Sequence, residues 1–264
     1  MTVGTLPYQP PADIVRRYNQ TKNVARNLTT MDKFLITGAS SGIGRELAIR
    51  LAARGAKLTL NGRSEAKLAE VSAACTGAAS IETLASDLTA PHAAEALVTK
   101  ANESMGGIDC VVHCAGMGLI KPAADTTDAE FSKIVNTNLR GTFLVAQSAC
   151  KVMAAQKHGL FITLPGILGK AVMKNAAAYI ASKFGVTGLI KTFAQEYQRS
   201  GIRFCLFFLG GVDSPFWDEI NMAVQRDKMI PVSTAADLIL QAIDAPPHLV
   251  LAEVVLQPES HQLV

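Results

Sequence analysis

The stretch Phe34-Leu-Ile-Thr-Gly-Ala-Ser-Ser-Gly-Ile-Gly-Arg45 predicts how this chain begins to fold. Its first three residues are apolar, as in a buried strand, and a helical pattern of apolar residues follows the last glycine. Gly38, Gly42 and Gly44 lie in the turn between them. Glycines let a backbone approach an anion closely, and the free N–H groups of a helix N-terminus favour negative charge. We therefore predict a phosphate-binding turn, the alternative being a tight strand–helix connection without a ligand.

The composition indicates one large, compact α/β domain. The chain has 264 residues, of which 49% are hydrophobic and 18% are charged. This length allows a well-buried core, and this composition excludes a disordered protein. The net charge of +3 is too small and too scattered to indicate nucleic-acid binding.

The five cysteines (Cys75, Cys110, Cys114, Cys150 and Cys205) lie in apolar segments, are odd in number and form no C-x-x-C pair. They favour buried, reduced thiols, so we expect a cytoplasmic protein. The histidines lack the spacing of metal ligands, and no metal is expected. No apolar run reaches the roughly 18–20 residues of a membrane span, so no membrane partner is expected.

Residues 1–30 differ from the rest of the chain. They contain three prolines, and their four basic residues against one acidic residue account for the whole net charge. We interpret them as an N-terminal extension of unclear role, either a surface arm or an incidental addition. A transit peptide is the alternative. The folded domain is predicted to span residues 31–264.

From Lys33 onward, strand-like and helix-like segments alternate, which predicts βαβ units around a parallel sheet. Strands are expected at residues 33–37, 57–61, 81–86, 108–113, 159–164, 203–208 and 249–256. Helices are expected at about residues 41–54, 64–75, 91–105, 127–156, 176–199 and 234–243. One domain accounts for all of them.

The end of the second strand predicts which cofactor is preferred. In a dinucleotide-binding fold this position faces the adenosine ribose, where an Asp or Glu selects NAD. The chain has Asn61, Gly62 and Arg63 instead. Because an arginine fork pairs well with a 2′-phosphate, we predict NADP in preference to NAD. The alternative is that Arg63 is simply solvated.

Two further turns fit a nucleotide. Asp87 and Leu88 follow the third strand, and Asp87 is expected to bind the adenine amine, to cap the helix after Pro91, or both. Ala115 and Gly116 follow the fourth strand and are small enough for a flat cofactor to lie against the backbone.

Tyr179 and Lys183 are four residues apart in a helical segment and therefore share one face. A phenol has a pKa near ~10, and a neighbouring ammonium lowers that pKa by favouring the phenolate. Such a pair can move a proton to or from an alcohol near neutral pH. Without the glycine turn upstream, a helix surface pair would be the better interpretation.

In this order, the motifs resemble those of the short-chain dehydrogenase/reductase family. The resemblance covers the chain from about Lys33 to its end and includes Asn136-Thr-Asn138 and Gly210-Gly-Val-Asp-Ser-Pro215. It implies a Rossmann-type, doubly wound α/β fold with a parallel sheet of about seven strands. It also implies a homodimer or homotetramer, with the Tyr179 helix at a subunit interface.

The resemblance implies roles for individual residues. Tyr179 would be the general acid/base, Lys183 would lower its pKa and hold the nicotinamide ribose, and Asn138 would support a water chain to Lys183. The expected cofactor-binding residues are Gly38, Ser40, Ser41, Gly42, Ile43, Gly44, Asn61, Arg63, Asp87, Leu88, Ala115, Gly116, Asn138, Tyr179, Lys183, Gly211, Val212 and Ser214.

Three positions depart from the family pattern. His113-Cys114 replaces a pair of asparagines, and Leu209 replaces a proline. The third departure is Gly166, which occupies the position of the family's catalytic serine, thirteen residues before Tyr179. That serine donates a hydrogen bond to the substrate carbonyl, and losing one such donor costs roughly 3–4 kcal/mol. Thr163 would face the wrong way on a regular strand to replace it, unless a bulge turned it.

Two functions remain open. The first is an NADP(H)-dependent oxidoreductase that interconverts a carbonyl and an alcohol with Tyr179, Lys183 and Asn138 but without the serine. The second is a cofactor-binding protein with little or no turnover, acting as a sensor or scaffold. The intact Tyr, Lys and Asn favour the first, because a non-catalytic relative has no chemical need for all three.

The segment from Ser214 to Ile230 takes the place of the family's variable lid. Its apolar residues, with others before Tyr179, are expected either to wall a pocket for a hydrophobic carbonyl substrate or to pack as ordinary core. These residues are Phe216, Trp217, Ile220, Met222 and Met229, with Leu168, Val172 and Met173 opposite.

Overall fold

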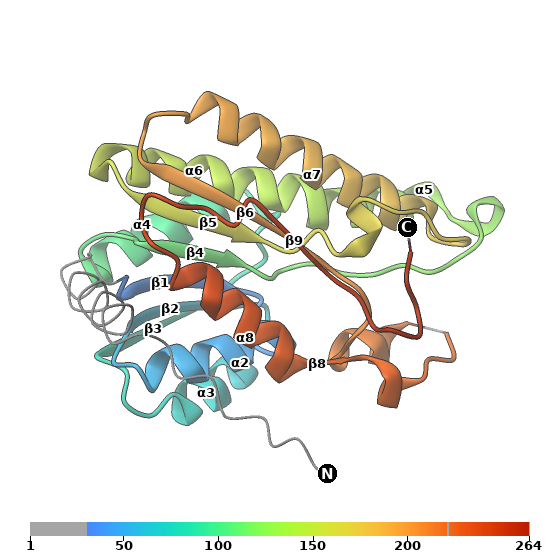
Figure 1. Cartoon of the computed structure of the whole chain (residues 1–264), viewed down its shortest axis with the longest axis horizontal. Coiled ribbons are helices and arrows are strands. Elements are labelled where there is room, and N and C mark those ends of the chain that lie inside the picture. Colours follow the sequence, from blue (N-terminus) through green and yellow to red (C-terminus); the bar gives the residue numbers. More distant parts are fainter. Residues whose placement is uncertain (1–30, 221, 264) are drawn as a thin grey trace, which may run out of the picture.

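The computed structural model describes residues 31–220 and 222–263, so the predicted N-terminal extension lies outside the described residues. The described chain forms one domain around a seven-stranded sheet (Figure 1). The strands of this sheet are β1 (Lys33–Thr37), β2 (Lys57–Gly62), β3 (Ser80–Ala85), β4 (Cys110–His113), β5 (Gly159–Thr163), β6 (Ile202–Leu209) and β9 (Glu253–Leu256).

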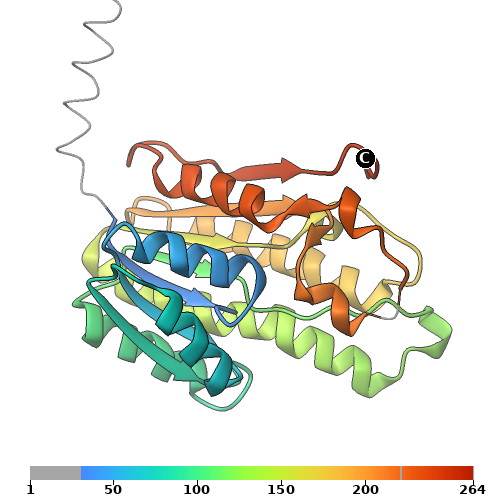
Figure 2. The same cartoon turned by 90° about the horizontal axis from the view of Figure 1, so that it is seen from below.

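All neighbouring strands of the sheet are parallel, in the order β3-β2-β1-β4-β5-β6-β9. Figure 2 shows β9, in red, at one edge of the sheet and the teal strands at the opposite side. Two short strands, β7 (Val212–Asp213) and β8 (Ile230–Pro231), form a separate parallel pair. The expected Rossmann-type, doubly wound sheet is confirmed.

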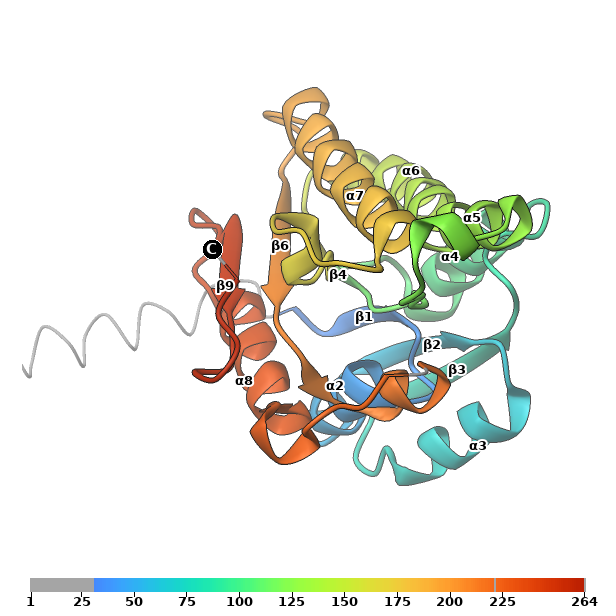
Figure 3. The ribbon, with the colours of Figure 1, turned by 90° about the vertical axis from the view of Figure 1, so that its right-hand side faces the viewer.

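Helices cover both faces of the sheet. The longer helices are α2 (Gly42–Ala52), α3 (Glu65–Ala74), α4 (Ala93–Met105), α5 (Asp128–Val135), α6 (Gly141–Gln156), α7 (Ala177–Glu196) and α8 (Val232–Ile243). Shorter helical turns are η1 (Ala123–Asp125), η2 (Asn136–Arg140), η3 (Ile167–Gly169), η4 (Pro215–Glu219) and η5 (Arg226–Lys228). Figure 3 shows α2, α3 and α8 on one side of the sheet and α4, α6 and α7 on the other.

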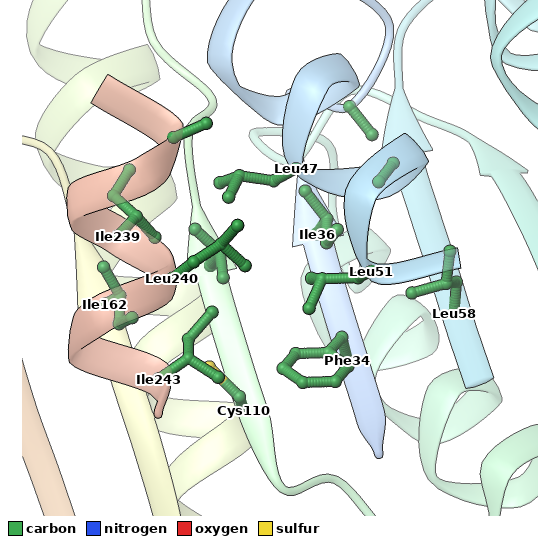
Figure 4. Packing of buried hydrophobic residues seen from close by; sticks show 14 of the residues in the cluster. Phe34, Ile36, Leu47, Leu51, Leu58, Cys110, Ile162, Ile239, Leu240 and Ile243 are labelled. Atoms are coloured by element: carbon green, nitrogen blue, oxygen red, sulfur yellow. The ribbon is translucent and has the colours of Figure 1, made fainter. Parts of the chain in front are cut away.

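Each face has its own apolar core. Leu47 and Leu51 of α2 and Ile239 of α8 pack over Phe34 and Ile36 of β1 (Figure 4). The opposite core joins residues of α4, α6 and α7 to the other side of the same strands. Strands buried on both faces explain the nearly continuous apolar runs in the sequence.

The strand order places the crevice of the molecule. The chain leaves β1 toward β2 and later returns to pair β4 with the other side of β1, so β1 and β4 form the switch point of the sheet. The carboxyl ends of four strands lie in register there, since Thr37 pairs with both Asn61 and His113, and His113 pairs with Thr163. Ligands of open α/β sheets bind outside this edge.

Most predicted elements differ from the structure by one to three residues at their ends, and the last strand and the helix over 127–156 differ more. The last strand begins at Glu253 rather than residue 249, because Leu249 to Leu251 are solvent-exposed and unpaired with β6. The predicted helix over 127–156 is interrupted by the π-helical turn η2. The helix predicted over 91–105 starts at Ala93, and its N-cap is His92 in the left-handed region, at φ 59°.

Candidate active site

A cleft of about 1150 Å³ opens along the carboxyl ends of the strands. Of the catalytic and cofactor-binding residues expected from the sequence, all but Asn138 line this cleft. The others that line it are Gly38, Ser40, Ser41, Gly42, Ile43, Gly44, Asn61, Arg63, Asp87, Leu88, Ala115, Gly116, Tyr179, Lys183, Gly211, Val212 and Ser214. One cleft therefore brings together turns that are far apart in the sequence.

The turn between β1 and α2 is built by close backbone contacts. Gly38 has φ 66°, and a Cβ there would lie 2.7 Å from the Ala115 nitrogen. A Cβ on Gly44 would overlap the Gly38 carbonyl oxygen. Helix α2 begins at Gly42, and its N-cap Ser41 makes no side-chain capping bond. The first N–H groups of α2 thus face the cleft without a side-chain partner at the cap, as an anion site requires.

At the end of β2, Asn61 has a structural role, whereas Arg63 brings a positive charge to the cleft. Asn61 is buried, and its amide nitrogen donates to the Leu84 carbonyl (2.9 Å) and to Ser86 Oγ (3.0 Å). Its side chain therefore joins β2 to β3, although the residue also lines the cleft. Arg63 is exposed and lines the cleft. Lys67 of α3 lines it as well and adds a second cation, which the sequence did not indicate.

Lys67 was not expected at the site because no sequence motif marks it, and its position depends on where α3 begins. Ser64 caps α3, its Oγ accepting from the Lys67 backbone nitrogen at 3.3 Å. Lys67 therefore lies in the first turn of α3, and both Lys67 and Arg63 line the cleft.

Asp87 does not cap a helix. Its Oδ1 accepts from the Thr89 backbone nitrogen (2.8 Å) and from Thr89 Oγ1 (2.7 Å), which closes a turn two residues long. These bonds lower the pKa of Asp87 and keep it ionised. The helix-capping interpretation is therefore wrong, since α4 begins after His92. Asp87 and the buried Leu88 both line the cleft.

Tyr179 and Lys183 lie one turn apart on α7, with Lys183 Nζ 5.6 Å from the centre of the Tyr179 ring. Lys183 Nζ donates to the Leu164 carbonyl at 3.1 Å. Burial lowers the pKa of Lys183 to about 8. Burial also raises the pKa of Tyr179 above its ordinary value, the opposite of the expected direction. Here the loss of water outweighs the ammonium at this distance.

Asn138 lies behind the cleft, in η2. Its Oδ1 accepts from the Met117 nitrogen (2.8 Å), and its Nδ2 donates to the Met117 carbonyl (2.9 Å) and to Ser182 Oγ (3.0 Å). Ser182 Oγ in turn donates to the Tyr179 carbonyl at 2.7 Å. A Cβ on Gly116 would lie 3.3 Å from Asn138 Oδ1 and 3.5 Å from Lys183 Nζ, so both side chains converge on Gly116.

Gly166 lines the cleft in a conformation that favours glycine. Its backbone has φ 71° and ψ 172°, a region that other residues adopt at a cost of about 1–3 kcal/mol. The nearest heavy atom to a Cβ there would be the Leu209 carbonyl oxygen at 3.5 Å, so space for a side chain exists. Thr163 is buried at the end of β5 and is not among the residues that line the cleft.

The far end of the cleft is apolar. Phe216 of η4 lies 6.1 Å from Tyr179, ring centre to ring centre, and a Cβ on Gly118 would collide with Phe216. Of the apolar residues expected here, Val172 is 73% exposed and does not line the cleft, so that prediction is wrong. The others do line it: Leu168, Met173, Phe216, Trp217, Ile220, Met222 and Met229.

The C-terminal segment also reaches the cleft, which the sequence did not indicate. Pro258, His261 and Leu263 line it. The Gln257 side chain pins this segment by accepting from the Leu263 nitrogen (2.6 Å) and donating to its carbonyl (3.1 Å). No periodic pattern marks such a loop, because its position depends on the pairing of β9 with β6.

Within residues 31–220 and 222–263, no three potential metal-ligating side chains form a cluster. In the same part of the chain, no helix has the length and apolar character needed to cross a membrane.

Comparison with known proteins agrees with this geometry. The family profile described as short chain dehydrogenase matches residues 32–225. Sepiapterin reductase of Chlorobaculum tepidum is 31% identical over 235 residues, which cover 86% of this chain and 96% of the relative.

Two solved structures are also similar. A levodione reductase crystal structure superposes with a TM-score of 0.78 at 30% identity, covering 87% of this chain and 98% of that one. A metagenomic short-chain oxidoreductase in complex with NADP superposes with a TM-score of 0.71 at 28% identity, covering 86% and 98%. The chain therefore belongs to the short-chain dehydrogenase family of oxidoreductases.

Proposed function

We propose that this protein is an NADP(H)-dependent oxidoreductase that interconverts a carbonyl and an alcohol. The observation that carries the proposal is the convergence of Tyr179 and Lys183 on the same cleft as the glycine turn of β1 and α2. The solved relative that holds NADP supports this cofactor class. The relatives named as sepiapterin and levodione reductases support carbonyl chemistry.

The residues fit a dinucleotide along the whole cleft. The N-terminus of α2 would hold the pyrophosphate, and Asp87 and Leu88 would border the adenine. Ala115 and Gly116 would lie against the sugar nearest Lys183. Arg63 and Lys67 would hold a 2′-phosphate, which supports NADP over NAD.

When bound, the nicotinamide supplies or accepts the hydride. Tyr179 would donate its phenolic proton to the carbonyl oxygen during reduction and take it back during oxidation. The raised pKa of Tyr179 keeps the phenol protonated at neutral pH, which suits an acid. Lys183 would hold the ribose and favour the phenolate as it forms, with Asn138 fixing the backbone beside it.

The apolar end of the cleft supports a hydrophobic carbonyl substrate. Phe216 lies beside the Tyr179 ring, and Trp217 packs edge-to-face on Phe216 with ring centres 5.4 Å apart. With glycine at position 166, the carbonyl oxygen would receive its hydrogen bond from Tyr179 alone or from water.

The direct test is the oxidation of NADPH with a panel of ketones, aldehydes and quinones. We expect turnover with at least one apolar carbonyl, and a loss of about 10²–10⁴ in kcat for Tyr179→Phe with cofactor affinity retained. NADPH binding without oxidation of any compound would reject the proposal.

That result would favour the second function, a cofactor-binding sensor or scaffold. The observation behind this alternative is Gly166, whose left-handed backbone suits glycine at the place where the family has a hydroxyl donor. Calorimetry with NADPH and a turnover assay on the same sample separate the two functions.

We also propose a homodimer or homotetramer in a reducing, cytoplasmic setting. Phe131 of α5, Phe143 of α6 and Phe184 of α7 are exposed large apolar side chains on neighbouring helices. Such exposed apolar groups are typical of a subunit interface.

The five cysteines are free thiols, which supports the reducing location. Light scattering would test the assembly, and a monomer at micromolar concentration would reject it.

A further inference from the structure

We propose that His113 is a positioning residue, which fixes the Asn138 backbone through Thr142 and ties it to the cofactor turn. His113 is 3% exposed and lies at the end of β4, in a position where the family pattern has asparagine. Its Nδ1 lies 2.8 Å from Thr37 Oγ1, and its Nε2 lies 3.0 Å from Thr142 Oγ1. This role rests on the proposed function, because Asn138 is linked through Ser182 to the carbonyl of Tyr179.

The two ends of this hydrogen-bonded chain fix its direction. Thr142 Oγ1 donates to the Asn138 carbonyl at 2.5 Å, so it must accept from His113 Nε2–H. At the other end, the Ala115 backbone nitrogen donates to Thr37 Oγ1 at 3.4 Å, and the Thr37 hydroxyl donates to His113 Nδ1. Each hydroxyl thus accepts one bond and donates one, and the imidazole is the Nε2–H tautomer.

Burial, and then the charge of Lys183, lower the pKa of His113 to about 3, so the ring is neutral at physiological pH. A neutral ring has one donor and one acceptor, and the chain uses both. A protonated ring would have two donors and would reverse the bond from Thr37.

The hydrogen-bonded chain ends at the π-helical turn η2, where the helical hydrogen bonding is irregular. In η2 the Gly141 nitrogen donates to the Asn136 carbonyl, five residues back. A π-turn of this kind displaces carbonyl groups from their regular partners. The Thr142 hydroxyl then holds the Asn138 carbonyl, while the Asn138 side chain holds Met117 and Ser182. Asn138 is therefore fixed from both its backbone and its side chain.

The chain joins two parts of the site that are far apart in the sequence. At one end are Thr37 and Ala115, next to the glycine turn. At the other end, Asn138 reaches the Tyr179 carbonyl through Ser182. The three bonds that run from Thr37 through His113 and Thr142 to the Asn138 carbonyl are buried, so leaving one of them unmade costs the full desolvation of a polar group. Thr142 offers the simplest test of this hydrogen-bonded chain, because its hydroxyl is the only polar group in its side chain.

The test compares Thr142→Val, which replaces the hydroxyl with a methyl group, with Thr142→Ser, which keeps the hydroxyl. For Thr142→Val we expect kcat to fall about ten-fold with little change in NADPH affinity. Without the Thr142 hydroxyl, Asn138 would shift, and a small shift of groups next to the reacting atoms lowers kcat. We also expect faster hydrogen exchange at the Met117 amide, which donates to Asn138 Oδ1. Thr142→Ser should recover most of both losses.

The matched control is Thr192→Val. Thr192 Oγ1 makes the same type of bond, to the Gly188 carbonyl four residues back at 3.0 Å, on an exposed part of α7. It should leave kcat and Met117 exchange unchanged. If Thr142→Val lowers only the melting temperature, with kcat and Met117 exchange unchanged, then His113 is merely structural and the proposal is overturned.

Nitrogen NMR of labelled histidine provides a readout that needs no turnover. We expect the neutral Nε2–H tautomer for His113 at neutral pH. The Nδ1–H tautomer, or a protonated ring, would contradict these hydrogen-bond directions and overturn the proposal. If the wild-type protein reduces no carbonyl, the proposed function fails, whereas the tautomer and the Met117 exchange rates still decide on the role of His113.

Discussion

On the β1 side of the cleft, Gly38 and Gly44 bring backbone against backbone, whereas on the β6 side Phe216 and Met229 form a wall of side chains. The first half has no room for a single added carbon atom at either glycine. The second half is assembled from η3, η4, residues 222–229 and the C-terminal segment, and its shape depends on which side chains these carry.

This difference explains what each half can do. A backbone cradle recognises a constant group such as a phosphate and tolerates little change. A wall of side chains on short turns can change its shape by substitution without altering the sheet, as binding loops on a rigid scaffold do. Gly166 stands between the two halves, with a constrained backbone and free space beyond its Cα.

The largest effect should come from breaking the backbone cradle. We expect Gly44→Ala to lower the free energy of unfolding by about 3 kcal/mol and to abolish NADPH binding, because the new Cβ would overlap the Gly38 carbonyl. Gly188→Ala is the control, since no neighbouring atom of the described residues lies within 4 Å of a Cβ there. In a helix that change should stabilise by about 0.5–1 kcal/mol. Urea unfolding and calorimetry give both quantities, and normal binding by Gly44→Ala would disprove the cradle.

The next effect concerns the boundary residue. We expect Gly166→Ser to raise kcat about 100-fold, the value of one preorganised donor, while costing about 1–3 kcal/mol of stability because φ is positive. Gly166→Ala should cost the same stability without the gain in kcat. Steady-state kinetics and thermal unfolding of the pair provide the test. Equal kcat values for the two variants would mean that the missing hydroxyl does not limit the reaction.

Smaller changes are expected at the outer end of the cradle. Arg63→Ala and Lys67→Ala should each weaken NADPH binding about ten-fold, since hydrogen bonds to charged groups are worth about 1.5–3 kcal/mol. Binding of NADH, which lacks the 2′-phosphate, should not change. Arg54→Ala is the control, because Arg54 pairs with Asp244 (2.9 Å) and is not among the residues that line the cleft. Equal losses for both cofactors would contradict the assignment.

The smallest effect near neutral pH comes from Lys183. Its pKa of about 8 lies below the ordinary value of 10.5, so the ammonium is present at pH 6 to 7 and is lost as pH rises through 8. For the reduction reaction, kcat/KM should therefore be constant between pH 6 and 7 and should fall about two-fold by pH 8. Tyr179 stays protonated there because its pKa is raised. A profile that instead declines from pH 6 would indicate a different titrating group.

The two halves of the cleft also differ in how much of them the sequence predicts. The glycine turn, Arg63, Asp87 and the pair on α7 were expected at one site, and the structure places all of them along one cleft. Each depends on a local rule: a glycine turn after a strand, a position just past the end of a strand, or a helical spacing of four. Lys67 follows no such rule, and its place at the cleft becomes clear only once the start of α3 is known.

What the sequence alone determined is the alternation of strands and helices, and with it the parallel sheet and its phosphate-binding edge. These follow from hydrophobic periodicity and from glycine's freedom of backbone, both properties of neighbouring residues. The tertiary structure decided the direction of the Tyr179 pKa shift, the role of Asp87, the entry of the C-terminal segment into the cleft, and the contacts of His113. Burial and hydrogen-bond partners set these features, and both depend on residues that meet only after the chain has folded.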